Sequence, residues 1–140
     1  MKNPENHAPV GGETIVILGS PRVPGDVLFK CLTGRGYLPI KAAAAQDVRN
    51  LFEHALVSAL IIMDSVAINE ALTLCKQLRR INHITPIIAL LNDADRSRGI
   101  EFLEAGADHY EGQPIRVEQL LRALAAFSRR TLRPPDQMAL

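Results

Sequence analysis

The chain has little of what several classes of protein require. Only two of its 140 residues are cysteine, and Cys31 and Cys75 lie in apolar helical patterns that predict small buried thiols. No apolar run reaches the roughly 20 residues of a membrane-spanning helix, and the polar residues 1–6 do not resemble a signal peptide. These absences predict a soluble protein of the reducing cytoplasm with no membrane partner.

Charge and histidine content exclude further classes. The 16 basic and 15 acidic residues leave a net charge of +1, so no global field draws the chain to nucleic acid or anionic lipid. The four histidines fall on unrelated elements, and we therefore expect no metal site. No expected element brings a histidine beside Ser20, Cys31 or Cys75, so nothing pairs a nucleophile with a base. The chain is predicted not to be an enzyme.

The length suits one compact domain. A chain of 140 residues that is 47% hydrophobic can bury a core of its own. Residues 1–13 contain prolines and glycines without periodicity and predict a flexible lead-in. Residues 131–140 include two adjacent prolines and predict a linker or a C-terminal tail. The folded domain is therefore expected over residues 14–130.

Apolar runs alternate with helical patterns along this domain. The expected strands are residues 15–18, 38–42, 59–63, 86–90 and 109–111. Asp93 is expected to cap a fourth helix, which ends before Gly106, and a fifth helix closes at Arg129 and Arg130. The apolar stripes that are expected to cover the sheet are Val23, Val27, Leu28, Cys31 and Leu32; Val48, Leu51, Phe52 and Ala55; Leu72, Cys75 and Leu78; and Val117, Leu120, Leu121, Leu124 and Phe127.

The character of the strands indicates a parallel sheet. The first, third and fourth runs are almost continuously hydrophobic, which is typical of strands buried on both faces, and the polar fifth run suits an edge. Right-handed crossovers then place helices on both sides of the sheet. The predicted fold is α/β, a doubly wound (βα)5 domain.

Candidate functional residues follow the strands, because doubly wound sheets bind ligands beyond the carboxyl ends of their strands. The residues at these positions are Gly19 and Ser20, Asp64, Leu91 and Asn92, and Gln113. Asp64 is the single carboxylate directly at the end of a core strand. With Ser20 it would lie at the switch point of the sheet.

Several motifs together resemble the CheY-like receiver domain of response regulators over residues 14–130. They are LGSP at 18–21, RGY at 35–37, IIMD at 61–64, TPIIALL at 85–91, EAGADHY at 104–110 and QP at 113–114. The resemblance implies a five-stranded parallel sheet of order 2-1-3-4-5. It also implies that Asp64 is the candidate phosphoacceptor, that Tyr110 matches a mobile aromatic switch residue, and that Pro114 is a cis-proline candidate.

The departures from the family pattern concern its chemistry. Gly19 and Ser20 stand where receivers have an acidic pair that holds Mg²⁺ with the acceptor carboxylate, Leu91 replaces the switch hydroxyl, and Gln113 replaces a lysine. The loop after Asp64 also lacks the usual Pro-Gly. We therefore expect a degenerate pseudo-receiver that uses no cofactor, with Mg²⁺ binding lost or weak.

Two residues keep alternative interpretations. Asp64 is either a residual phosphoacceptor or an inherited carboxylate bonded to Ser20 or to backbone N–H groups. Tyr110 is either a switch or a static aromatic at the sheet edge. An arginine cluster near the C-terminus either contacts DNA phosphates or a partner, or complements the end of a helix; it comprises Arg122, Arg129, Arg130 and Arg133.

The resemblance predicts a phosphorylation-independent dimerisation or protein-interaction module of two-component-type signalling. It would regulate transcription through a fused or partner effector, which would make any DNA contact, and a sensor protein is a second possible partner. A homodimer is expected through the fourth helix, residues 109–111 and the fifth helix, with Arg96, Arg98, Glu101, Asp108, Glu118 and Arg122 at the interface. Alternatives are a weakly active phosphorelay receiver that accepts phosphate at Asp64, and a small-ligand sensor that uses the Gly19–Ser20 turn.

Overall fold

Strands and helices alternate along the whole described chain. The computed structural model describes residues 13–19, 25–82, 84–91, 96–112 and 116–132. The elements are β1 (Thr14–Leu18), α2 (Gly25–Gly34), β2 (Leu38–Ala42), α3 (Ala45–His54), β3 (Ala59–Ile62), α4 (Ile68–Ile81), β4 (Ile87–Leu90), α5 (Arg96–Ala105), β5 (His109–Glu111) and α6 (Val117–Leu132).

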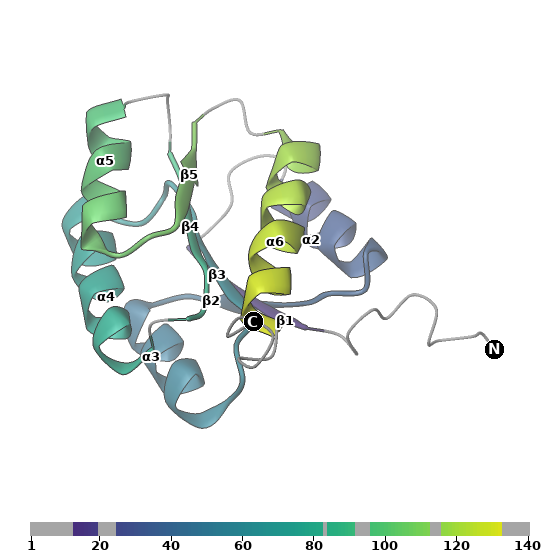
Figure 1. Ribbon diagram of the computed structural model, residues 1–140, viewed down its shortest axis with the longest axis horizontal. Helices are drawn as coiled ribbons and strands as arrows, with labels where there is room; N and C mark the ends of the chain where they lie inside the picture. The colour runs from purple at the N-terminus through teal and green to yellow at the C-terminus, as the bar shows by residue number, and fades with distance from the viewer. Residues whose placement is uncertain (1–12, 20–24, 83, 92–95, 113–115, 133–140) are drawn as a thin grey trace, which may run out of the picture.

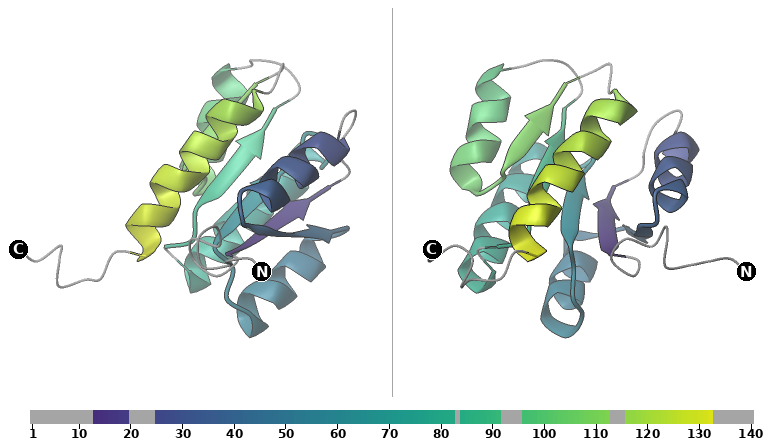
Figure 2. Two further views of the ribbon diagram at one scale, coloured as in Figure 1. Left: turned by 90° about the vertical axis from the view of Figure 1, so that its right-hand side faces the viewer. Right: turned by 45° about the vertical axis from the view of Figure 1, so that its right-hand side comes forward.

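The strands form one parallel sheet of order β2-β1-β3-β4-β5. Leu18 at the end of β1 is level with Ala42 in β2 and Ile62 in β3, so these three strands end at the same edge. Helices α2 and α6 cover one face, and α3, α4 and α5 cover the other (Figures 1 and 2). The predicted doubly wound fold and its strand order are confirmed.

A hydrophobic core lies on each face of the sheet, as the continuous apolar runs predicted. Successive strand residues point to opposite faces, so Val16 and Leu18 pack with α3, α4 and α5, whereas Ile15 and Ile17 pack with α2 and α6. Each fully buried leucine or isoleucine stabilises the fold by about 1.5–3 kcal/mol. Within the described chain, no helix combines the length and apolar character needed to cross a bilayer.

Some element boundaries and stripe members differ from the prediction. The last helix continues two residues past Arg130, because the first signal that stops it is Pro134, which disfavours helix at the preceding residue. Val27 is 43% exposed, and Ala55 is an exposed C-cap of α3, so neither belongs to the core. The predicted helix end before Gly106 is confirmed, with Gly106 at a positive φ of 122°. Val23 and the predicted cap Asp93 lie outside the described residues.

Candidate functional site

The ends of β1 and β3 bring Gly19 and Asp64 to one edge of the sheet. The N–H of Met63 donates to the carbonyl of Leu18 over 2.9 Å, so the chain leaves the two strands side by side. Asp64 is partly buried and has contacts within the chain, while its Oδ2 atom is enclosed and receives no hydrogen bond. Ser20, the predicted partner of this carboxylate, lies outside the described residues. Both interpretations of Asp64 stay predictions.

Gly19 is packed so closely that a side chain at its position would force Ser65 and Val66 to move. Its φ is +100°, a conformation that favours glycine. A Cβ atom there would lie 2.8 Å from Oγ of Ser65, 2.8 Å from Cγ2 of Val66 and 3.2 Å from Cβ of Met63. The loop between β3 and α4 therefore occupies the space that an acidic side chain at residue 19 would need.

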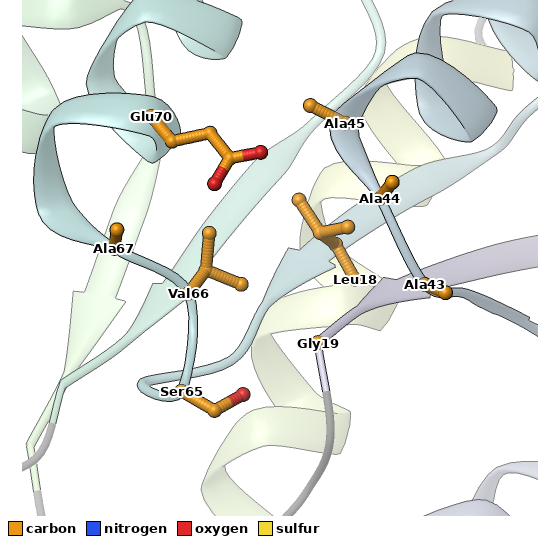
Figure 3. A pocket seen from close by; sticks show the side chains of 9 residues that line it. All are labelled: Leu18, Gly19, Ala43, Ala44, Ala45, Ser65, Val66, Ala67 and Glu70. Atoms are coloured by element: carbon orange, nitrogen blue, oxygen red, sulfur yellow. The ribbon is translucent and has the colours of Figure 1, made fainter.

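A pocket of about 390 Å³ lies beside Gly19, between the starts of α3 and α4 (Figure 3). Its walls are mostly small side chains, and its polar side chains are Ser65 and Glu70, whose carboxylate extends from α4 toward the start of α3. The N-cap residues of the two helices, Ala44 and Ala67, offer no side-chain cap. The N–H of Ala44 donates to Oδ2 of Asp47 over 3.2 Å, so the start of α3 already carries a carboxylate, as the start of α4 does with Glu70. Both carboxylates disfavour a further anion, so the pocket does not match a simple phosphate cradle.

The described side chains at this edge do not fit a resident Mg²⁺. This ion needs near-octahedral oxygen ligation anchored by carboxylates. The described residues hold no group of three or more histidine, cysteine, aspartate or glutamate side chains placed for a metal ion, and Asp64 faces glycine at the end of β1.

Leu91 and Tyr110 share one face of the sheet beside α5. Leu91, at the end of β4, is 5% exposed, and its N–H donates to the carbonyl of Glu111 over 2.8 Å. Tyr110 is level with Ala89 and packs against the same core. A Cβ atom built on Gly99 of α5 would overlap Cζ and both Cε atoms of the Tyr110 ring. The Tyr110 ring therefore occupies the space that the absent side chain of Gly99 leaves on α5, a notch that holds the ring in place.

The predicted interface residue Asp108 is bound within the chain. Its Oδ2 accepts a hydrogen bond from Nη2 of Arg79 at 2.6 Å and another from the N–H of Ile87 at 2.9 Å. The same guanidinium donates to the carbonyls of Gly106 and Thr85, each over 2.8 Å. Arg79 therefore joins α4 to the starts of β4 and β5, and Asp108 is engaged within the chain rather than at an outer surface.

The other predicted interface residues are distributed over α5 and α6. Arg96, Arg98 and Glu101 are exposed on α5, and Arg98 has contacts within the chain. Glu118 of α6 instead pairs with Arg35 after α2 at 3.2 Å, and Arg122 is exposed one turn further along α6. Sequence reasoning missed Ile100 and Leu103, which are 45% and 42% exposed on α5. Their i, i+3 spacing beside a charged face was the available signal.

Four predicted site positions have no structural counterpart here. Ser20, Asn92, Gln113 and Pro114 lie outside the described residues, and so does the proposed cis bond.

The prediction of buried thiols is confirmed for Cys75, whereas Cys31 is only partly buried. Burial raises the pKa of Cys75 to about 11; Arg79 opposes this rise and Asp108 adds to it.

The fold is that of CheY-like receiver domains. The receiver domain of the TMAO respiratory system response regulator TorR superposes with a TM-score of 0.77 at 24% identity, covering 85% of this chain and 98% of that one. The receiver domain of the Francisella response regulator 1452 gives a TM-score of 0.75 at 19% identity, covering 86% of this chain and 99% of that one. At these identities the likeness establishes the fold alone.

Sequence similarity points to the same class. The chain is 27% identical over 125 residues to the response regulator MprA of Mycobacterium ulcerans, covering 89% of this chain and 54% of that protein. MprA of Mycobacterium avium is 28% identical over 122 residues, covering 87% and 53%. The chain thus spans about half the length of these curated relatives. No protein-family model matches it. Together the comparisons support a receiver domain of the response-regulator type.

Proposed function

We propose that the chain is a receiver domain whose contacts with partners do not depend on phosphoryl transfer. The observation that carries this proposal is the packing of Gly19 against Ser65 and Val66. Receivers phosphorylate themselves with a Mg²⁺ that an acidic pair holds at the position of Gly19 and Ser20. In this chain the first of those carboxylates is absent, and the neighbouring loop fills its space.

The surroundings of Tyr110 support the same proposal. A switch residue moves only if its two positions differ little in free energy, and shifting such an equilibrium from 1:99 to 99:1 needs about 5.5 kcal/mol of differential binding. Leu91 offers no hydroxyl to a phosphoryl group, and its buried side chain occupies the same face of the sheet as Tyr110. The notch at Gly99 holds the ring. The domain therefore keeps one conformation permanently.

A single permanent conformation suits an interaction module. We propose that it forms a homodimer through the surface of α5 and the adjoining edge strand β5. It would act in the cytoplasm on an effector, fused or separate, that regulates transcription. The similarity to response regulators about twice its length supports this role.

The test is exposure of the chain to Mg²⁺ with acetyl phosphate, and separately with beryllofluoride. We expect no mass shift and no change in the amide NMR spectrum, because the described donors do not hold the metal. The TorR receiver, treated in parallel, controls for the reagents. A mass shift that Asp64→Asn abolishes would contradict the proposal and favour the alternative of a weakly active phosphorelay receiver.

The pocket beside Gly19 favours a second candidate, a sensor of a small ligand. Its small walls leave room for a compact metabolite with both a donor for Glu70 and an acceptor for the helix N-terminal N–H groups. A thermal-shift screen of small zwitterions tests it, with Ala67→Phe as the variant that fills the pocket. A rise in melting temperature that disappears in Ala67→Phe supports this candidate, and no rise for any zwitterion removes it.

A further inference from the structure

The charges of α5 run against its own helix dipole. A helix N-terminus favours acidic side chains and a C-terminus favours basic ones. Helix α4 follows this rule, with Glu70 in its first turn and Arg79 and Arg80 in its last. Helix α5 instead begins with Arg96 and carries Glu104 in its last turn, with no acidic residue in the first turn and no basic residue in the last. An isolated α5 is destabilised by this arrangement.

Neither of these charges is compensated inside the described chain. Arg96 and Glu104 are exposed, and neither forms a hydrogen bond or an ion pair with the residues that the structure describes. The buried side of α5 consists of Gly99, Phe102 and Ala105. The two charged side chains thus belong to the outward surface of the helix.

The same outward surface has an apolar centre. Ile100 and Leu103 are 45% and 42% exposed and lie on the stripe that joins Arg96 to Glu104. Ile100 is four residues from each charge, so it marks the midpoint between a positive and a negative end. Arg98 lies two positions before Ile100 and therefore on another side of the helix.

We propose that this stripe is the contact between two copies of the chain, with α5 antiparallel to the partner's α5 and Ile100 at the two-fold axis. This inference rests on the proposed function, and it specifies the dimer. Arg96 then faces the partner's Glu104, and Glu104 faces the partner's Arg96. Each charge also lies at the end of the partner helix whose dipole favours it, so the arrangement that destabilises one helix stabilises the pair.

A second copy fits this surface better than an unrelated partner does. A stripe that reads positive, apolar, negative is complementary to itself when it is turned by a two-fold rotation, and closed two-fold dimers are the commonest oligomers. Two apolar side chains are too few for a typical interface of about 800 Å² per partner. The edge strand β5, which packs beside α5, extends the contact surface.

Charge reversal tests this arrangement. Arg96→Glu gives a stripe with two negative ends, and Glu104→Arg gives one with two positive ends. By sedimentation equilibrium, we expect the unaltered chain to dimerise and each single variant to dimerise about tenfold more weakly or worse. Arg96→Glu with Glu104→Arg in one chain should restore the dimer. An equimolar mixture of the two single variants should form a heterodimer, because one chain then presents two negative ends and the other two positive ends.

The controls separate this arrangement from general effects. Arg80→Glu on α4 and Glu53→Arg on α3 make the same charge changes at exposed positions outside α5 and should leave dimerisation unchanged. Each single reversal removes an unfavourable dipole interaction, so the unfolding temperature of the monomer, measured at a concentration too low for dimers, should not fall. An unchanged unfolding temperature would show that a variant that no longer dimerises is still folded.

The outcomes distinguish this inference from the proposed function. A dimer that is indifferent to both single reversals, or single variants that fail to associate when mixed, would overturn the antiparallel α5 contact and leave phosphorylation-independent dimerisation standing. An unaltered chain that stays monomeric at all concentrations would overturn the dimer itself, and the α5 contact with it.

Discussion

The ring of Tyr110 lies over Gly99, where any larger residue would place its first side-chain carbon. A Cβ atom at residue 99 would overlap three atoms of this ring. Glycine in a helix interior costs roughly 1 kcal/mol relative to alanine, so helix propensity does not account for Gly99. The residue is explained by the ring that it accommodates, and α5 is thereby fixed against β5.

We expect Gly99→Ala to lower the free energy of unfolding by about 1–2 kcal/mol, because the clash with Tyr110 exceeds the gain in helix propensity. In a Tyr110→Ala background the clash is gone, so the same substitution should raise stability by up to about 1 kcal/mol. Urea unfolding of the four chains measures both effects. A loss of equal size in the two backgrounds would show that the ring is not the cause.

Arg79→Met should destabilise the fold by about 2–4 kcal/mol, because it leaves Asp108 and three backbone carbonyls without their shared donor. Arg79→Lys should recover little of this loss, since one ammonium cannot replace the guanidinium fork. Arg49→Met is the matched control: Arg49 bonds Gln46 and Gln77 at the surface, and its loss should cost less than about 1 kcal/mol. Equal losses for Arg79→Met and Arg49→Met would contradict this.

Gly19→Asp should not create a Mg²⁺ site. The new side chain meets Ser65 and Val66, so we expect a loss of about 1–3 kcal/mol in urea unfolding and no Mg²⁺ binding by calorimetry. Gly19→Ala should lose comparable stability, because the clash begins at Cβ. Tight Mg²⁺ binding by Gly19→Asp would mean that the loop yields easily, against the packing described above.

Cys75 should make the stability fall at alkaline pH. Its folded pKa of about 11 lies above the ordinary thiol value of 9.0, so above pH 9 the unfolded chain releases a proton that the folded chain retains. The contribution is fully present below pH 9 and is lost as the pH rises toward 11; the total is about 2–3 kcal/mol. The difference in unfolding free energy between the unaltered chain and Cys75→Ala, measured at pH 8 and pH 10.5, isolates it. A difference that does not change with pH would contradict the cause.

Periodicity predicted the fold because apolar strands leave a direct pattern in the chain. Continuous runs such as residues 59–62 occur where both faces are covered, and they gave the sheet and its layers. Val27 was wrongly assigned to the core because a helical stripe does not reveal how far a neighbouring helix reaches over it. Contacts between adjacent elements thus limit what periodicity predicts.

The candidate site was less predictable, because its decisive contacts join distant residues. Gly19 was identified as a departure from the receiver pattern, yet its packing against Val66 depends on a loop 47 positions further along the chain. Asp108 resembled an exposed partner-binding carboxylate, because nothing in its local sequence indicates that Arg79 reaches it. The stripe on α5 was missed because Ile100 and Leu103 alone resemble ordinary core positions.

The fit between Gly19 and the loop after β3 has an evolutionary consequence. A lineage that restored an aspartate at residue 19 would first carry the clash with Ser65 and Val66, and a lineage that rebuilt the loop would gain no metal ligand by doing so. Neither the aspartate nor the rebuilt loop would improve function by itself, so selection would not retain either change alone. Under the proposed function, regaining Mg²⁺-dependent phosphoryl transfer would need both of these changes besides those at Leu91 and Gln113, so this packing would make a loss of that activity effectively one-way.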